Sequence, residues 1–430
     1  MIKHSILFLL LFAWMTPATY AQETVLLKGK VVRSETLKPL GLATLVYPNK
    51  SLGFEADDTG EFSFYLTASP SDSLEIRHLG YEVLKISIAD FLTGDRVIKL
   101  KDDEVALAEV VIVSRKDQID ATKLMKRVYK LYAQNKPKEP HIAKSYFRET
   151  GILEGEYVFF NESRGYSIFM GQRKDAALFS NYKFFPEQSR ISNVASGFKV
   201  LLENAIQERN GLDLSYVGFS NNENNYRRFQ EYGPLSKRYH SRFDYQLDST
   251  YINNGVKYYK VGFNDNQLKG AVVVNGVSLQ LLEATYETDE LISNPFTKST
   301  PGQISLAFRY INEVPYLSEM TSKSTHNGLE IVNYLKTVAQ KFRGFDLSEN
   351  QYWGFNMISE HFYISYSPEE WLSIPYYSNP EFKAVESDLK IGGKDLEEQF
   401  TDHSGAWMNT PTFEIGAAKN KIKELEVYFN

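Results

Sequence analysis

The first hundred positions after the N-terminal segment consist mainly of short runs in which apolar and polar residues alternate. Residues 61–66 are typical: Phe62, Phe64 and Leu66 alternate with their more polar neighbours, which is the pattern of a strand with one buried face. The same reasoning predicts strands at residues 24–32, 42–47, 73–77, 83–88, 97–100 and 110–113. About seven short strands separated by turn residues predict a β-sandwich.

The pattern changes at residue 121. Leu124, Val128 and Leu131 form an apolar stripe with helical spacing, Asp120 is suited to cap the first turn, and Pro137 follows the stripe. We therefore predict a helix over residues 121–134. Beyond it, strand patterns occur at residues 142–151, 154–170, 243–247, 257–263, 270–286, 305–311, 317–323, 330–338 and 360–366. These long segments predict a large curved antiparallel sheet with a few helices, so the chain is mostly β.

The N-terminus has the pattern of a secretory signal. Lys3 precedes an apolar run at residues 6–15, Pro17 breaks the run, and Thr19 and Ala21 are small residues at the two positions that a signal peptidase reads. The run is shorter than the roughly 20 residues that span a bilayer, and no later stretch approaches that length. We favour a cleaved signal over a buried N-terminal helix and expect cleavage after Ala21. The mature chain then has no transmembrane segment.

Four regions follow from these patterns. We predict a signal peptide at residues 1–21, a sandwich at residues 24–113, a charged linker at residues 114–118 and a large domain at residues 119–430. Because the 430 residues include no Cys, an exported chain of this kind is better suited to the envelope of a Gram-negative bacterium than to a eukaryotic secretory route. We expect it in the periplasm or at the outer membrane. The net charge of −6 argues against nucleic acid as a partner.

The sandwich region carries a family resemblance. It contains Gly29-Lys30-Val31-Val32, Asp58-Thr59-Gly60-Glu61-Phe62, Leu79-Gly80-Tyr81 and Leu107-Ala108-Glu109-Val110-Val111 in that order. These motifs resemble the carboxypeptidase regulatory-like domain, a small transthyretin-like sandwich that is common at the N-terminus of exported proteins of Bacteroidetes-type bacteria. The family has Thr before the turn acids in many members, where Ala56 stands here. The resemblance implies a fold and a location rather than catalysis.

A second resemblance lies in the large domain. Tyr146-Phe147-Arg148-Glu149 and Tyr366-Ser367-Pro368-Glu369-Glu370-Trp371 resemble motifs of uncharacterised Bacteroidetes envelope proteins. In that group the regulatory-like domain precedes a domain similar to the half-barrel of the lipoprotein carrier. The resemblance implies a half-barrel for residues 119–430 and supplies no catalytic residues.

The sequence contains no recognisable catalytic or metal motif. A zinc carboxypeptidase needs His-x-x-Glu, and none of the seven His residues has Glu three positions later. Gly-x-Ser-x-Gly and the phosphate-binding Gly-x-x-x-x-Gly-Lys-Ser/Thr are also absent from the sequence. We therefore predict no catalytic residue, no metal and no cofactor. We favour a non-catalytic envelope protein that binds a lipid, a glycan or an outer-membrane protein; a glycosidase or peptidase with dispersed carboxylates is the alternative.

One aromatic group is a candidate for ligand binding. Trp353, Trp371, Tyr376 and Tyr377 lie close together in the sequence and offer flat apolar surfaces with polar edges, which suit a sugar ring or an acyl chain. The plainer interpretation is that these side chains fill the open side of the curved sheet, since aromatic side chains are readily buried.

Overall fold

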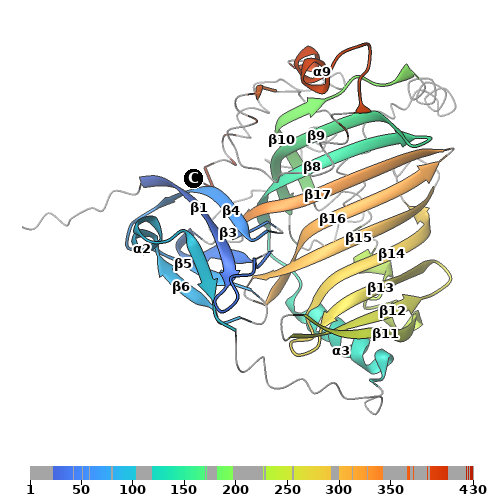
Figure 1. Cartoon of the computed structure of the whole chain (residues 1–430). Helices are drawn as coiled ribbons and strands as arrows, with labels where there is room; N and C mark the ends of the chain where they lie inside the picture. Colours follow the sequence, from blue (N-terminus) through green and yellow to red (C-terminus); the bar gives the residue numbers. More distant parts are fainter. Residues whose placement is uncertain are drawn as a thin grey trace, which may run out of the picture.

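The computed structural model places a small sandwich beside a large curled sheet (Figure 1). The described residues are 23–41, 43–50, 52–57, 59–78, 81–102, 119–169, 171, 182–196, 226, 229–253, 256–291, 300–311, 313–326, 328–341, 366–368, 371, 385, 388–404, 423, 425 and 427–429. The signal peptide, the linker and the strand predicted at residues 110–113 lie outside them.

The first layer of the sandwich is a sheet of three strands in the order β4-β1-β7. Its members are β1 (Glu23–Arg33), β4 (Glu61–Ala68) and β7 (Val97–Leu100). β1 runs antiparallel to β4 and parallel to β7. The turn before β4 is made by Asp57, whose side chain accepts hydrogen bonds from the backbone N–H groups of Thr59 and Glu61, both at 2.9 Å. Gly60 in this turn has φ of 77°, a conformation that favours glycine.

The second layer corrects the predicted seven-stranded sandwich, because the first sheet has only three strands and the other four are hydrogen-bonded into the large sheet. It consists of β2 (Thr44–Tyr47), β3 (Leu52–Glu55), β5 (Ser73–Arg77) and β6 (Leu84–Ser87). These four strands are hydrogen-bonded in the order β3-β2-β5-β6, and β3 continues into the large sheet. The sequence patterns missed β3, which has only four residues. Two short helices complete this part, η1 (Pro48–Lys50) and α2 (Ile88–Thr93).

The large sheet is an antiparallel half-barrel, as the sequence indicates. Seven strands follow each other as neighbours: β11 (Asp244–Asn253), β12 (Val256–Asn264), β13 (Leu268–Asn275), β14 (Leu281–Leu291), β15 (Thr300–Ile311), β16 (Val314–His326) and β17 (Leu329–Lys341). β17 then pairs with β8 (His141–Leu153), which pairs with β9 (Glu156–Phe169), which pairs with β10 (Tyr182–Ile191). β8 and β17 are paired along almost their whole length, so segments far apart in the sequence form the middle of the sheet.

One face of the half-barrel carries the helix predicted from the apolar stripe. α3 (Ala121–Asn135) is capped by Asp120, whose side chain accepts a hydrogen bond of 3.0 Å from the N–H of Lys123. Its buried residues Leu124, Val128 and Tyr132 pack in one hydrophobic core with Phe147 of β8. We call this face of the sheet the inner face. Elsewhere in the described part of the chain lie η2 (His240–Arg242) and α9 (Leu396–His403).

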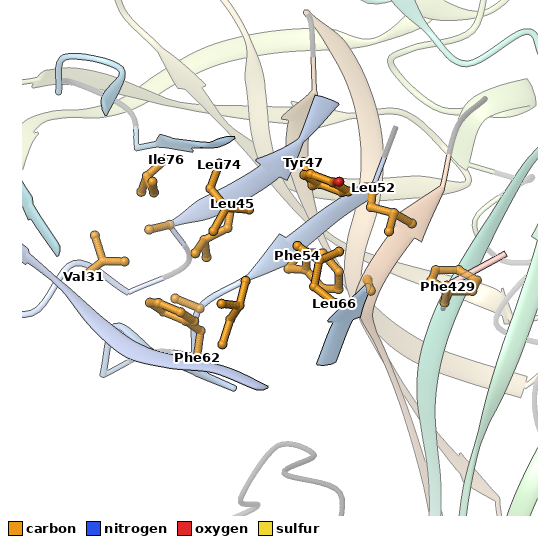
Figure 2. Packing of buried hydrophobic residues seen from close by; sticks show 14 of the residues in the cluster. Val31, Leu45, Tyr47, Leu52, Phe54, Phe62, Leu66, Leu74, Ile76 and Phe429 are labelled. Atoms are coloured by element: carbon orange, nitrogen blue, oxygen red, sulfur yellow. The ribbon is translucent and has the colours of Figure 1, made fainter. Parts of the chain in front are cut away.

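The sandwich and the half-barrel share a hydrophobic core. Leu45, Phe54 and Leu66 of the sandwich belong to the same buried cluster as Tyr166 of β9 and Phe429 near the C-terminus. Figure 2 shows Phe429 beside the strands at the edge of this cluster. Backbone hydrogen bonds also join the two parts. β3 pairs antiparallel with residues 339–341 of β17, beyond the point where β16 stops pairing with that strand.

Candidate ligand-binding site

A row of polar side chains crosses the inner face of the half-barrel. Directly opposite residues of antiparallel strands project to the same face, and their Cβ atoms lie about 5 Å apart. Ser322 of β16 is opposite Asn333 of β17, Asn333 is opposite Glu149 of β8, and Glu149 is opposite Asn161 of β9. Phe147 lies two residues from Glu149 and packs with α3, which places the row on the inner face. We call these four residues the inner polar row.

The row is deeply buried. The exposed fractions are 2% for Ser322, 4% for Asn333, 4% for Glu149 and 0% for Asn161. Within the described part of the chain, four of its buried atoms have no hydrogen-bond partner: Oε2 of Glu149, Oδ1 of Asn333, and Oδ1 and Nδ2 of Asn161. Leaving one such atom unsatisfied costs about 1–3 kcal/mol, so four in one row represent a large loss of stability.

Serines in other rows of the same face are satisfied. Ser163 and Ser189 are directly opposite each other on β9 and β10, and their hydroxyl oxygens are 2.9 Å apart. Ser145 and Ser167 form a similar pair at 2.8 Å. The local sheet geometry therefore allows buried polar side chains on this face to pair with each other.

Burial also changes the acidity of the row. It raises the pKa of Glu149 from 4.5 to about 7, with desolvation as the cause. Near neutral pH the carboxyl group is therefore protonated in a large part of the molecules. A protonated carboxyl group donates one hydrogen bond and accepts others, whereas a carboxylate only accepts.

Apolar residues border the row on both sides. Along the strands, Phe147, Leu335 and Met320 belong to the core on one side. Gly151 and Phe159 lie opposite each other on the other side, where a Cβ on Gly151 would come 3.3 Å from Cβ of Phe159. Across the sheet, the row continues into Ile304 of β15, Tyr286 of β14 and Gly270 of β13. The polar section is thus confined to the strands from β16 to β9.

The charged side chains of the central strands project to the opposite, outer face. Glu162 of β9 forms an ion pair of 2.5 Å with Arg190 of β10 and accepts a hydrogen bond from the hydroxyl of Tyr146. Burial and the Glu162 carboxylate raise the pKa of Tyr146 well above its ordinary value. Arg148, next to Glu149 in the sequence, lies over the ring of Tyr334 at 5.2 Å. Glu162 is therefore paired with Arg190 on the outer face, and Glu149 is the one ionisable member of the inner polar row.

Trp371 is the one sequence-predicted site residue that the structure describes, and it lies at the outer face. Its ring is 4.3 Å from the guanidinium carbon of Arg190 and 4.7 Å from that of Arg164. Its backbone oxygen accepts a hydrogen bond of 3.1 Å from Arg164. Trp371 also packs against the buried cluster that contains Phe400. Trp353, Tyr376 and Tyr377 lie outside the described residues, so the aromatic site as a set stays a prediction.

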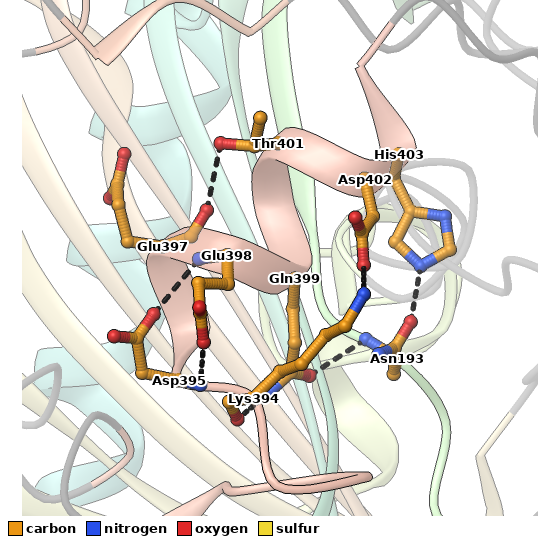
Figure 3. A network of polar contacts seen from close by, with 9 residues as sticks. All are labelled: Asn193, Lys394, Asp395, Glu397, Glu398, Gln399, Thr401, Asp402 and His403. Atoms are coloured by element: carbon orange, nitrogen blue, oxygen red, sulfur yellow. Dashed lines mark hydrogen bonds and ion pairs between the residues drawn. The ribbon is translucent and has the colours of Figure 1, made fainter.

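α9 is hydrogen-bonded to the residues that follow β10 (Figure 3). The side chain of Gln399 accepts a hydrogen bond of 2.9 Å from the N–H of Asn193 and donates two of 3.0 Å to the backbone oxygens of Leu389 and Lys394. Nε2 of His403 is 2.8 Å from Oδ1 of Asn193. Because Asn193 follows Ile191, which lies opposite Asn161, this contact holds the end of β10 beside the inner polar row.

Sequence reasoning missed the inner polar row. Its residues come from four strands, and the motif that contains Glu149 was informative only as a resemblance. The signal that was available is local: alternation places Phe147 and Glu149 on the same face, so a strongly apolar residue predicts burial of the acid.

Neither a metal site nor a membrane-spanning helix is found among the described residues. No group of three or more His, Cys, Asp or Glu side chains there is arranged to hold a metal ion. No helix in the same part of the chain has the length and apolar character needed to cross a membrane.

Comparison with known proteins supports the resemblance of the N-terminal part. Residues 27–112 match the CarboxypepD_reg-like domain. This match confirms the family that the sandwich motifs indicate. It covers a minor part of the chain, and no curated protein matches the sequence.

Two solved structures are similar to part of the chain. A DUF1329 family protein from Desulfovibrio piger has 11% sequence identity and a TM-score of 0.25, and the match covers 54% of this chain and 95% of that one. A LolA superfamily protein from Nitrosomonas europaea has 11% identity and a TM-score of 0.22, with 54% and 96% covered.

Proposed function

We propose that this protein is an exported, non-catalytic cell-envelope protein that binds a ligand on the inner face of its half-barrel. The observation that carries the proposal is the inner polar row, in which four buried hydrogen-bonding atoms without a partner lie together beside the hydrophobic core. Buried polar atoms are almost always satisfied in folded proteins. A ligand that pairs with the row recovers the free energy that these atoms otherwise lose.

The position of the row favours binding over a purely structural role. Its members belong to four adjacent strands in the middle of the sheet, which hold the side chains in fixed relative positions. Sites built on regular elements are more rigid than sites on loops, and rigidity reduces the entropy that binding costs. The secretory pattern at the N-terminus and the CarboxypepD_reg-like domain support the location in the envelope.

A hydrolase is the weaker alternative. Glycosidases use two carboxyl groups about 5–10 Å apart that flank the bond to be broken. The inner polar row contains one acid, Glu149, and the nearby Glu162 belongs to the outer face, where Arg190 is its ion-pair partner. One raised pKa without a second acid supports recognition of a ligand more than cleavage.

Native mass spectrometry of the exported protein tests the proposal. The protein is expressed with its own signal, purified without detergent and compared with the double variant Asn161→Leu, Asn333→Leu. We expect a small molecule on the wild-type protein and its loss from the double variant. Asn264→Leu is the matched control, because Asn264 is an exposed amide on β12. A wild-type protein that carries no molecule, or a double variant that keeps it, would contradict the proposal.

A further inference from the structure

We propose that the group recognised by the inner polar row is an uncharged polyhydroxy group, such as a sugar ring or a glycerol-like polyol. The inference rests on the proposed function, because it names the chemical class of the ligand for the same site. It is carried by the hydrogen-bonding capacity of the row, by the placement of the neighbouring charges and by the apolar residues on either side.

The unsatisfied atoms require a partner that both donates and accepts. Three of them are acceptors: Oε2 of Glu149, Oδ1 of Asn161 and Oδ1 of Asn333. The fourth, Nδ2 of Asn161, is a donor. A hydroxyl group donates one hydrogen bond and accepts two, so adjacent hydroxyl groups can satisfy all four atoms. An ammonium group has no acceptor and would leave Nδ2 of Asn161 unsatisfied.

The charges around the row do not suit an anion. A phosphate or carboxylate group binds best to Arg, Lys or backbone N–H groups. Lys144, Arg148 and Arg164 occupy positions of β8 and β9 that alternate with those of the row, so these side chains project to the outer face. The ionisable group of the row itself is Glu149, whose negative form repels an anion. The row is therefore unsuited to the phosphate of a lipid head group.

The apolar borders fit the ring of a sugar. Phe147 and Phe159 lie in the rows on either side of the inner polar row, each about 7 Å along the strand from it, the length of two strand residues. Sugar rings combine hydroxyl groups at their edge with C–H groups on their faces. A ring whose edge meets Asn161 and Glu149 can therefore place apolar atoms against these neighbouring side chains.

Three probes with the same alkyl chain test this inference: octyl β-D-glucoside, octyl phosphate and octylammonium, each titrated into the mature protein below its micelle concentration by calorimetry. We expect the glucoside to bind at least tenfold more tightly than either charged probe. Asn161→Leu should weaken glucoside binding by about tenfold, since it removes hydrogen bonds and leaves a hydroxyl group of the ligand without a partner. Asn264→Leu should bind like the wild type.

Glu149→Gln distinguishes an uncharged ligand from a positively charged one. A bound ammonium group would lose its counter-charge in this variant, whereas an amide, like a protonated carboxyl group, can still donate and accept hydrogen bonds with a glucoside. Tighter binding of octylammonium that Glu149→Gln abolishes would overturn the polyhydroxy class and leave the proposed function standing. Tighter binding of octyl phosphate, or binding of none of the three probes, would also overturn it. These comparisons on the wild-type protein decide the matter even if Asn161→Leu does not fold. The absence of any co-purified molecule is the separate result that contradicts ligand binding itself.

Discussion

Glu55 of β3 and Arg309 of β15 form an ion pair of 3.5 Å between the sandwich and the half-barrel. Their side chains are only 3% and 4% exposed. Nη2 of Arg309 also donates a hydrogen bond of 3.3 Å to Gln340, which lies opposite Gly53 where β3 pairs with β17. Burial lowers the pKa of the Arg309 guanidinium, although the Glu55 carboxylate opposes this shift. An ion pair, backbone hydrogen bonds and a shared hydrophobic core therefore join the two parts of the chain.

Removing one member of this pair should destabilise the protein strongly. Arg309→Met leaves Glu55 as a buried charge without this counter-ion, and breaking a buried pair in this way costs about 3–5 kcal/mol. The double variant Glu55→Gln, Arg309→Met should recover much of that loss. Urea denaturation provides the measurement. As a control, Glu287→Gln removes an exposed contact of 3.9 Å with Lys269 and should change the free energy of unfolding by less than about 1 kcal/mol. If Arg309→Met and Glu287→Gln changed the free energy of unfolding equally, this would contradict a stabilising buried ion pair.

The sandwich alone should fold, and its stability should depend less on Glu55 than the stability of the full chain does. Residues 24–113 carry all seven strands of the sandwich, so we predict a cooperative unfolding transition with a β-type circular dichroism spectrum. In this fragment Arg309 and the β17 edge are missing, and Glu55 is exposed to water. Glu55→Gln should therefore be nearly neutral in the fragment and destabilising in the full chain. A disordered fragment would show that the sandwich needs the half-barrel in order to fold.

The stability of the protein should depend on pH through Glu149. The folded-state pKa of about 7 lies above the ordinary value of 4.5, so the folded state holds this proton more tightly than the unfolded state does. The full contribution to stability is present below about pH 4.5 and is lost as the pH rises through 7. Relative to Glu149→Gln, the wild type should lose about 3 kcal/mol between these limits, because each pKa unit corresponds to 1.36 kcal/mol. Denaturation of both proteins from pH 5 to 9 checks this, and a constant difference would contradict the burial of a titrating acid.

Export should be visible at the N-terminus of the native protein. The apolar run at residues 6–15 and the small residues before Gln22 predict cleavage after Ala21. Intact-mass analysis of the protein from an envelope fraction should find Gln22 as the first residue, either free or cyclised. Recovery of the chain with Met1 in a cytoplasmic fraction would contradict the expected export.

Local patterns predict the elements better than they predict their assembly. α3 could be predicted because its apolar stripe, its Asp120 cap and Pro137 are all within one short segment. β3 could not, because its four residues include a glycine and its strand state depends on pairing with β2 and with residues 339–341 of β17. The inner polar row is hidden for the same reason: the register between β17 and β8 brings Asn333 opposite Glu149, and no local pattern encodes that register.

The most direct test of the inner polar row is the free energy of unfolding of the ligand-free double variant Asn161→Leu, Asn333→Leu. Residues kept for binding often reduce the stability of the unbound protein. Replacing amides whose buried atoms have no partner with apolar side chains of similar size should stabilise the unbound protein, by about 1–3 kcal/mol. Denaturation in urea, with wild type and variant both stripped of bound molecules, gives this value. A variant that is clearly less stable than the wild type would show that the two amides have a structural role and would contradict the assignment of the row to a ligand.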